Sequence, residues 1–269
     1  MFSRGVRREM IAAHDPALPL RKIAPLLASA DLVFLNLESP FSDQGPYHQD
    51  GLIFHAPPDA IVGLDLAHVA VVSTANNHSR DCGAHGVEFT MQWLCSHGIA
   101  AVGSGASEGQ AHRGVVLERN GVRFGFLGYT YDQQNGNWRD IDPRIAVTDL
   151  SAVSRDVRDL GKRCDVVIVS MHNGVEYLTK PTQKQISFAH AAIDAGATLV
   201  IGHHPHVVQP MEKYRKGLIY YSLGNFVFDQ FQREATQHGE IAEVDFLGKG
   251  VLVSNLWPVR VTITGPQIE

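Results

Sequence analysis

The 269-residue sequence predicts an α/β fold built on a mainly parallel sheet or pair of sheets. Apolar runs of strand length alternate with amphipathic helical segments, a pattern typical of parallel strands joined by helices. The composition, with 44% hydrophobic residues, is that of a globular chain with a sizeable core. Because no repeat, low-complexity tract or linker interrupts the alternation, we expect a single domain over residues 1–269.

The first half of the chain is expected to contain two helices, three strands and a hairpin. They fall, in order, at residues 20–30 (helix), 31–38 (strand), 68–78 (strand), 85–97 (helix), 98–105 (strand) and 114–130 (hairpin). The strands are apolar runs such as DLVFLNLE and HVAVVSTANNH, of which the second turns abruptly polar. Asn120-Gly121 marks the turn of the hairpin, because this pair tolerates the positive φ angles of a tight hairpin turn.

The second half repeats the alternation after a loop at residues 132–142 that is rich in Asp, Asn and Gly. The expected elements are a helix at 149–161, a strand at 164–174, a helix at 182–196, strands at 197–206 and 217–229, and a β-hairpin within 240–263. The helix at 182–196 is amphipathic and is ended by Gly196.

The composition argues against several classes of function. A net charge of -5 and a pI near 6.3 disfavour nucleic acid as the main partner, since phosphate binding needs a basic surface. The three cysteines, without C-x-x-C spacing, indicate neither a disulfide framework nor a zinc ribbon. No apolar run approaches the ~20 residues that cross a bilayer, and the N-terminus MFSRGVRREM is too polar for a signal peptide. As given, the chain is expected to be soluble, and cytoplasmic by default.

Four of the expected strands end in residues that bind metals or carry protons. These residues are, strand by strand, Glu38; Asn76, Asn77 and His78; His172; and His203, His204 and His206. In α/β folds the carboxyl ends of the strands converge on one edge of the sheet, where ligands bind. We therefore expect these side chains to meet in space.

The donor atoms of this set suit a catalytic metal. A carboxylate, an amide oxygen and neutral imidazoles, without thiolates, favour Mn, Fe or Zn over a structural zinc site of the cysteine type. A carboxylate can bridge two cations, and an amide oxygen adds coordination without charge, which keeps the site electrophilic. We expect one or two divalent ions per chain. A lone histidine is more often a polar residue with a structural role, so the prediction depends on four strand ends behaving alike.

Residues next to these strand ends have two interpretations each. Asn76-Asn77 fits a turn or a helix cap as well as a metal site. His78 fits a general acid whose tautomer is held by Asp81, three residues on. Asp81 is also placed to cap the helix that follows, and both roles can hold together.

Two charged residues lie close to the strand ends in the sequence. Glu176, four residues after His172, is either a contact for a substrate amine or for the metal ligands, or a surface carboxylate. Arg80 is either a partner for a substrate carboxylate or phosphate, through its planar guanidinium, or a surface arginine.

The chain resembles the CapA proteins of bacterial capsule (poly-γ-glutamate) synthesis, a family of the calcineurin-like metallophosphoesterase superfamily. The resemblance covers nearly the whole chain in five ordered blocks: DLVFLNLESPFSD, STANNHSRDCGAHGVEFTMQWLCSHGIAAVGSG, VVIVSMHNGVEY, AGATLVIGHHPHVVQPMEKY and IYYSLGNFVFDQ. It implies a metallophosphatase-like core, in which two sheets form a β-sandwich flanked by helices, with a dinuclear metal centre at the strand ends.

The resemblance also implies a role for each matched residue. The metal ligands are Glu38, as the bridging carboxylate, and Asn77, His172, His204 and His206. The catalytic acid is His78, supported by Asp81. Independently of the resemblance, residues expected to contact substrate or to lie behind the ligands are Arg80, Glu176, His203, Asn225 and Asn76. His203 is the extra histidine of the G-H-x-H block, and packing is its alternative role.

The chain departs from the family pattern at two places. A Gly-Asp pair that supplies a ligand of the first metal normally stands just before a stretch such as MFSRGV, and the first strand with this pair is expected upstream of Met1. Either the sequence is truncated or the protein lacks this ligand. In the second case one ion is expected to be held well, without His206, and the site near His206 to be weak or empty. Asn173 stands where the family commonly has an aromatic residue, which alters the substrate-facing surface.

Three hypotheses of function remain. The first is metal-dependent hydrolysis or transfer at an amide or phosphate centre, for which the family implies a peptide or γ-glutamyl polymer substrate and membrane-bound polymer synthases as partners. The second is epimerisation of a peptide residue at its Cα by the same centre, because a fold does not fix a reaction. The third is a non-catalytic polymer-binding or assembly subunit with a degraded metal site. Family members often carry a membrane anchor and work outside the cytoplasm, and the oligomeric state is open.

Overall fold

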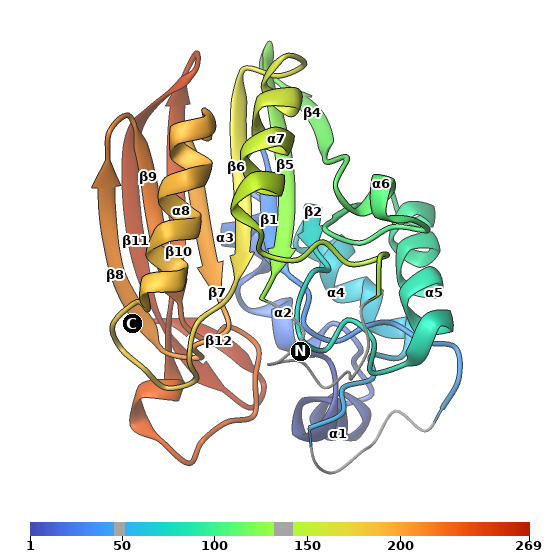
Figure 1. Cartoon of the computed structure of the whole chain (residues 1–269). Coiled ribbons are helices and arrows are strands. Elements are labelled where there is room, and N and C mark those ends of the chain that lie inside the picture. The colour runs from blue at the N-terminus through green and yellow to red at the C-terminus, as the bar shows by residue number, and fades with distance from the viewer. Residues whose placement is uncertain (46–51, 132–141) are drawn as a thin grey trace.

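A six-stranded sheet forms the centre of the computed structural model, which describes residues 1–45, 52–131 and 142–269 (Figure 1). Its strands, in spatial order, are β4 (Val115–Arg119), β5 (Val122–Thr130), β6 (Val166–His172), β7 (Leu199–His203), β9 (Gly217–Leu223) and β8 (Val208–Tyr214). The four inner strands are parallel, and the two outer strands pair antiparallel with them. Every residue of β6 is buried, as expected for a parallel strand covered on both faces.

Two helices, α7 (Leu150–Gly161) and α8 (Gln183–Ala195), cover one face of this sheet and lie in front of it in Figure 1. Asp149 caps α7 by accepting from the amide of Ala152, and Thr182 with Gln185 forms a capping box on α8. Gly196 ends α8 at a φ of 116°, a left-handed conformation that glycine adopts without strain.

Two smaller sheets cover the opposite face. One is parallel and contains β1 (Val33–Asn36), β2 (Val69–Ser73) and β3 (Ala100–Val102); the other is antiparallel and contains β10 (His238–Leu247), β11 (Gly250–Thr262) and β12 (Gly265–Ile268). Both pack on the six-stranded sheet through one apolar cluster that includes Val71, Phe126 and Val244. The expected two-layer α/β core is therefore confirmed, with the second layer divided into two sheets.

Helices also cover the outside of this second layer. They are α1 (Arg4–Ala12), α2 (Leu18–Arg21), α3 (Ala24–Leu27), α4 (Ile61–Leu66), preceded by a 3₁₀ turn at Pro58–Ala60, and α5 (Gly83–Ser96). The short α6 (Glu108–Ala111) leads into the six-stranded sheet, and a 3₁₀ turn at Glu234–Gln237 precedes β10. No helix in the described part of the chain combines the length and the apolar composition needed to cross a bilayer.

Several elements differ from those expected. The single helix expected at residues 20–30 is wrong: Pro19 and Pro25 begin two separate short helices, because proline fits the first turn of a helix but not its interior. β8 was not expected, and Pro210 within it is tolerated because β8 is an edge strand. The C-terminal hairpin is confirmed and gains β12 as a third strand.

The hairpin turn is confirmed at Asn120 and Gly121, whose φ angles are 51° and 77°. The strand expected at 217–229 ends at Leu223, and the rest is irregular chain that returns to the strand ends. The loop expected at residues 132–142 lies outside the described residues except for its last residue.

Candidate metal centre

The carboxyl ends of β1, β2, β6 and β7 meet at one end of the sandwich. Asn77 and His172 lie 95 residues apart in the chain, yet Nε2 of His172 is 2.8 Å from Oδ1 of Asn77. Nε2 of His206 lies 3.8 Å from Oε1 of Glu38. The ring of His204 stands between the other two imidazoles, with centroids 5.0 Å from His172 and 5.9 Å from His206. All five side chains are buried, so the sequence-predicted ligands come together in a site shielded from water.

The Asn-Asn-His turn after β2 is fixed to the end of β1 by Asn76. Its Nδ2 donates to the carbonyl oxygen of Leu37 at 2.8 Å, and its Oδ1 accepts from the amide of His78 at 3.0 Å. Ser79 Oγ accepts from the amide of Asn76. The two asparagines therefore have different tasks, since Asn76 holds the turn and the side chain of Asn77 meets His172.

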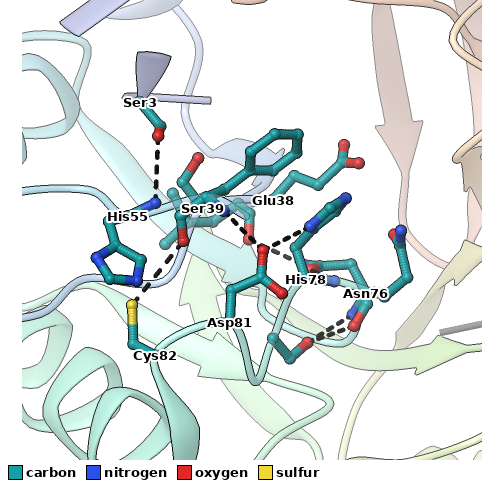
Figure 2. A network of polar contacts seen from close by, with 12 residues as sticks. Ser3, Glu38, Ser39, His55, Asn76, His78, Asp81 and Cys82 are labelled. Carbon is teal, nitrogen blue, oxygen red and sulfur yellow. Dashed lines mark hydrogen bonds and ion pairs between the residues drawn. The ribbon is translucent and has the colours of Figure 1, made fainter. Parts of the chain in front are cut away.

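His78 forms a pair with Asp81 beside the predicted ligands (Figure 2). Nδ1 of His78 donates to Oδ2 of Asp81 at 2.7 Å, and the same oxygen accepts from the amide of Phe54 at 2.7 Å. The Phe54 ring stacks on the imidazole with centroids 3.8 Å apart. The N-cap of α5 is Cys82, so Asp81 orients His78 and does not cap the helix. Because Nδ1 is bound to Asp81, proton exchange with a bound molecule would have to use Nε2 of His78.

The segment after β7 has an unusual backbone. His204 has a φ of 101° and His206 a φ of 59°, both in a region that residues with a Cβ rarely adopt. Such residues cost about 1–3 kcal/mol each and are found where surrounding structure enforces them, often at functional sites. This turn brings the rings of His204 and His206 together, with centroids 5.9 Å apart.

The imidazole of His206 is oriented from behind by Asn225. Its Nδ1 lies 2.9 Å from Oδ1 of Asn225, whose Nδ2 donates to the carbonyl oxygen of Thr236 at 3.0 Å. Because that amide nitrogen is already a donor, the amide oxygen faces His206 and the ring must donate from Nδ1. Nε2 is then the acceptor nitrogen of the ring, and it lies 3.8 Å from Oε1 of Glu38.

His203 belongs to the packing around the site. It lies at the end of β7, and its ring centroid is 6.2 Å from that of Phe34. Burial lowers the pKa of His203 to about 3, so the ring is neutral.

Two of the predicted substrate-contacting residues lie elsewhere. Nε of Arg80 is 3.0 Å from Oδ2 of Asp142, which also binds Arg144. Glu176 is exposed in the turn after β6, and this turn is not helical, so the four-residue spacing does not return the carboxylate to His172. Arg80 is thus paired with Asp142, and the exposed Glu176 is not part of the buried cluster.

The buried donors fit a cation chemically. Burial is the main cause that lowers the pKa of both His172 and His204, in the second case to about 3, so both rings are neutral and can offer lone pairs. Nδ1 of each ring and Oε1 of Glu38 are buried atoms without a hydrogen-bond partner. Among the described residues no three His, Cys, Asp or Glu side chains are close enough to form a preassembled cage. The donor atoms therefore lie near one another but are not arranged around a common position as the ligands of a bound ion would be.

Aromatic side chains that the sequence reasoning missed line the same place. Phe54 stacks on His78, and the rings of Tyr131 and Phe228 lie 4.7 Å from His204 and 4.9 Å from His206. Tyr131 directly follows β5, a fifth strand that ends at the same edge of the sheet. The position of Tyr131 at a strand end could have predicted its place near the site. Phe54 and Phe228 lie in irregular segments, where the sequence gives no such indication.

Comparison with known proteins places these features in a family. The sequence model of one protein family, described as bacterial capsule synthesis protein PGA_cap, matches residues 1–230. The capsule biosynthesis protein CapA of Bacillus anthracis is 29% identical over 280 residues, which cover 99% of this chain and 67% of the relative. The PGA biosynthesis protein CapA of Bacillus subtilis is 33% identical over 212 residues, 77% of this chain and 56% of the relative. The chain thus spans roughly half to two thirds of the length of these relatives.

Solved structures share the fold at low sequence identity. A hypothetical protein from Thermus thermophilus aligns with a TM-score of 0.61 at 17% identity and covers 92% of this chain and 93% of its own. A phosphatase from Mycoplasma pneumoniae aligns with a TM-score of 0.59 at 15% identity, covering 89% and 86%. The chain therefore shares its fold with these two proteins, and the match of the family model over most of the chain shows that it belongs to the bacterial capsule synthesis protein family PGA_cap.

Proposed function

We propose that this chain is a metal-dependent enzyme that hydrolyses or transfers at an amide or phosphate centre of a γ-linked glutamyl polymer or peptide. The main support is the buried meeting of Glu38, Asn77 and three histidines beside the His78–Asp81 pair. Its relatives are named for capsule and PGA biosynthesis, which supports a polymer of this class as the substrate. Membrane-bound polymer synthases are the partners proposed on the same basis.

Divalent Mn, Fe or Zn fits the donor set. Glu38, Asn77, His172 and His204 would hold one ion, and Glu38 would share a second with His206, from which its Oε1 is 3.8 Å away. Metal ions of this kind stabilise negative charge at the reacting centre and lower the pKa of water. Within residues 1–269 the site near His206 has fewer donors, so we propose that it is the weaker of the two.

The His78–Asp81 pair would supply the proton for the leaving group. The Asp81 carboxylate accepts from Nδ1 and so orients the ring, with Nε2 as the nitrogen that would give up the proton. Phe54 covers one face of the imidazole and limits its rotation. His78 is thereby held in a single orientation next to the gathered ligands, and the buried aromatic rings around them keep bulk water out.

Paired variants test the proposal. We expect the chain loaded with Mn, Fe or Zn to cleave a γ-glutamyl peptide or a chromogenic phosphodiester. His172→Ala should lose both metal and turnover, and His78→Ala should keep the metal but lose about 10²–10⁴-fold in kcat. The matched control is His190→Ala on α8, whose ring pairs with Glu212 away from the site. Turnover that survives His172→Ala would contradict the proposal.

The same assays separate the two rival functions. Solvent deuterium at the Cα of recovered, uncleaved peptide would indicate epimerisation in place of hydrolysis. Stoichiometric metal binding without turnover on any γ-glutamyl peptide or phosphodiester, together with polymer binding, would favour the non-catalytic assembly role.

A further inference from the structure

Tyr177 lies beside the candidate metal centre, in the turn after β6. Its ring centroid is 6.4 Å from that of His206, and its amide donates to the carbonyl oxygen of Pro205 at 2.8 Å. Its φ of 65° is one that residues with a Cβ rarely adopt, so the contacts of this turn outweigh a local cost. His206 is buried, whereas 36% of Tyr177 is exposed. The tyrosine therefore extends from the buried donors to the surface of the molecule.

The guanidinium of Arg233 lies over the ring of Tyr177. Its Cζ is 4.7 Å from the ring centroid. Such a cation–π contact holds the guanidinium in place and leaves N–H donors for a further partner. Within residues 1–45, 52–131 and 142–269 no carboxylate pairs with Arg233, and the neighbouring Glu234 is bound to Arg260 instead. Arg233 is thus an oriented cation with donors available to a ligand.

Hydrogen bonds fix the segment that carries Arg233 to the candidate site. Oγ1 of Thr236 lies 2.7 Å from the carbonyl oxygen of Gln230 and 2.8 Å from that of Arg233. The side chain of Gln230 accepts from Nδ2 of Asn225 at 3.3 Å and donates to the hydroxyl of Tyr177 at 3.3 Å. Asn225 is the residue that orients a predicted metal ligand. The same contacts therefore position the arginine relative to the metal centre.

Two opposite charges act on Tyr177. Burial is the main cause that raises the pKa of Tyr177, and Glu176 raises it further whereas Arg233 lowers it. Glu176 interacts with the hydroxyl group, while Arg233 lies over the ring. An anionic group bound beside His206 is attracted by Arg233 and repelled by Glu176. The position of that anionic group along the tyrosine therefore decides whether it is bound.

We propose that Arg233, held over Tyr177, binds a free α-carboxylate of a γ-linked glutamyl chain next to the reacting centre and so determines the specificity for this linkage. A γ-linked chain keeps the α-carboxylate of each residue, because the amide bonds use the γ-carboxyl groups. The planar guanidinium matches such a carboxylate with two parallel N–H···O bonds. An α-linked chain places its carboxylates at the ends of longer side chains. The inference rests on the proposed function for its substrate class.

Binding of short oligomers, measured without turnover, tests the inference. The three ligands are a γ-linked glutamyl oligomer, the same oligomer with neutral α-carboxamides, and an α-linked glutamyl oligomer of equal length. Isothermal titration calorimetry on the Mn-loaded His78→Ala chain avoids cleavage. We expect the γ-linked carboxylate oligomer to bind about tenfold more tightly than the other two. Arg233→Gln in the same chain should remove this preference by weakening only the binding of the γ-linked carboxylate oligomer.

Further variants separate the arginine from general charge and from folding. Arg158→Gln, in the last turn of α7, removes the same charge at the opposite end of the sheet and should keep the preference. Tyr177→Leu should lower the affinity for the γ-linked oligomer and Tyr177→Phe should retain it, because the contact with the guanidinium needs the ring. Glu176→Gln should raise this affinity. Circular dichroism would show that each variant is folded.

The outcomes distinguish the inference from the proposed function. Equal affinity of the three oligomers, no binding of any of them, or an equal loss for carboxylate and carboxamide in Arg233→Gln would overturn the inference. Selective binding that depends on Arg233, without cleavage by the chain that retains His78, would support the inference and remove the proposed reaction. Cleavage whose kcat/KM ratio between the carboxylate and carboxamide oligomers is unchanged by Arg233→Gln would do the reverse.

Discussion

The histidines at the strand ends differ in the partner that each ring finds for its other nitrogen. His78 donates from Nδ1 to the carboxylate of Asp81, which orients the ring. His206 donates from Nδ1 to the amide oxygen of Asn225, which fixes a tautomer without supplying a compensating charge. We propose that this difference in one neighbouring side chain separates the proton donor from the metal ligand, although both are buried histidines.

Asn225→Leu tests this distinction at His206. The leucine keeps the approximate volume but removes the acceptor, so we expect the Nδ1–H tautomer of His206 to lose its dominance in the metal-free protein. Affinity for the metal near His206 should fall by about 10–100-fold, as when such a supporting contact is lost elsewhere. Side-chain ¹⁵N NMR measures the tautomer and metal titration the affinity. Asn255→Leu, on exposed β11, is the matched control, and an unchanged tautomer in Asn225→Leu would contradict the argument.

At the scale of elements, the sequence predicted which side chains meet at the carboxyl ends of the parallel strands. Glu38, Asn77, His172 and His204 follow apolar runs, and the common direction of their strands was enough to predict that these side chains meet. The contribution of Phe54 could not be predicted, because it enters from an irregular segment and depends on a contact with Asp81 that only the folded chain makes. The positive φ angles of His204 and His206 after β7 could not be predicted either, because a histidine in a sequence does not by itself indicate a positive φ.

One close approach between elements holds Asn225 in place. A Cβ at Gly239, the second residue of β10, would overlap the backbone oxygen of Asn225, and the same glycine bridges to Gly224. Only glycine permits β10 to pass so near the segment that orients His206. The first strand of the C-terminal sheet thereby supports the candidate site without supplying a ligand.

Gly239→Ala should separate these two segments. We expect a loss of about 1–3 kcal/mol in the free energy of unfolding, because the added methyl group has no space to occupy. Gly250→Ala, at the start of the neighbouring β11, would place its methyl group 4.0 Å from the backbone oxygen of Leu247, an ordinary contact, and should change stability little. Chemical denaturation measures both variants. Equal stability of Gly239→Ala and the unchanged protein would show that β10 can move away from Asn225 without cost.

At the scale of the whole molecule, the candidate site joins parts of the chain that are far apart in sequence. Glu38 and Asn77 come from the small parallel sheet, whereas His172 and His206 come from the end of the six-stranded sheet. The layer arrangement was predictable from the alternation of strands and helices and from the family resemblance. The division of the second layer into two sheets was not, because it depends on which edges pair and not on which segments are strands.

A ligand that draws these segments together should stabilise the entire fold. Since the unfolded chain cannot offer the same donors at one place, an ion at one hundred times its Kd adds about 2.7 kcal/mol to the free energy of unfolding. For a chain of this size we expect the Tm to rise by about 5–10 °C on adding Mn, Fe or Zn and to return on chelation. His172→Ala should lose most of this shift and His190→Ala should retain it, as differential scanning calorimetry would measure. If none of the three metals changes the Tm, the gathered donors do not hold an ion. An ion bound by side chains from both layers would link the layers and stabilise the folded chain.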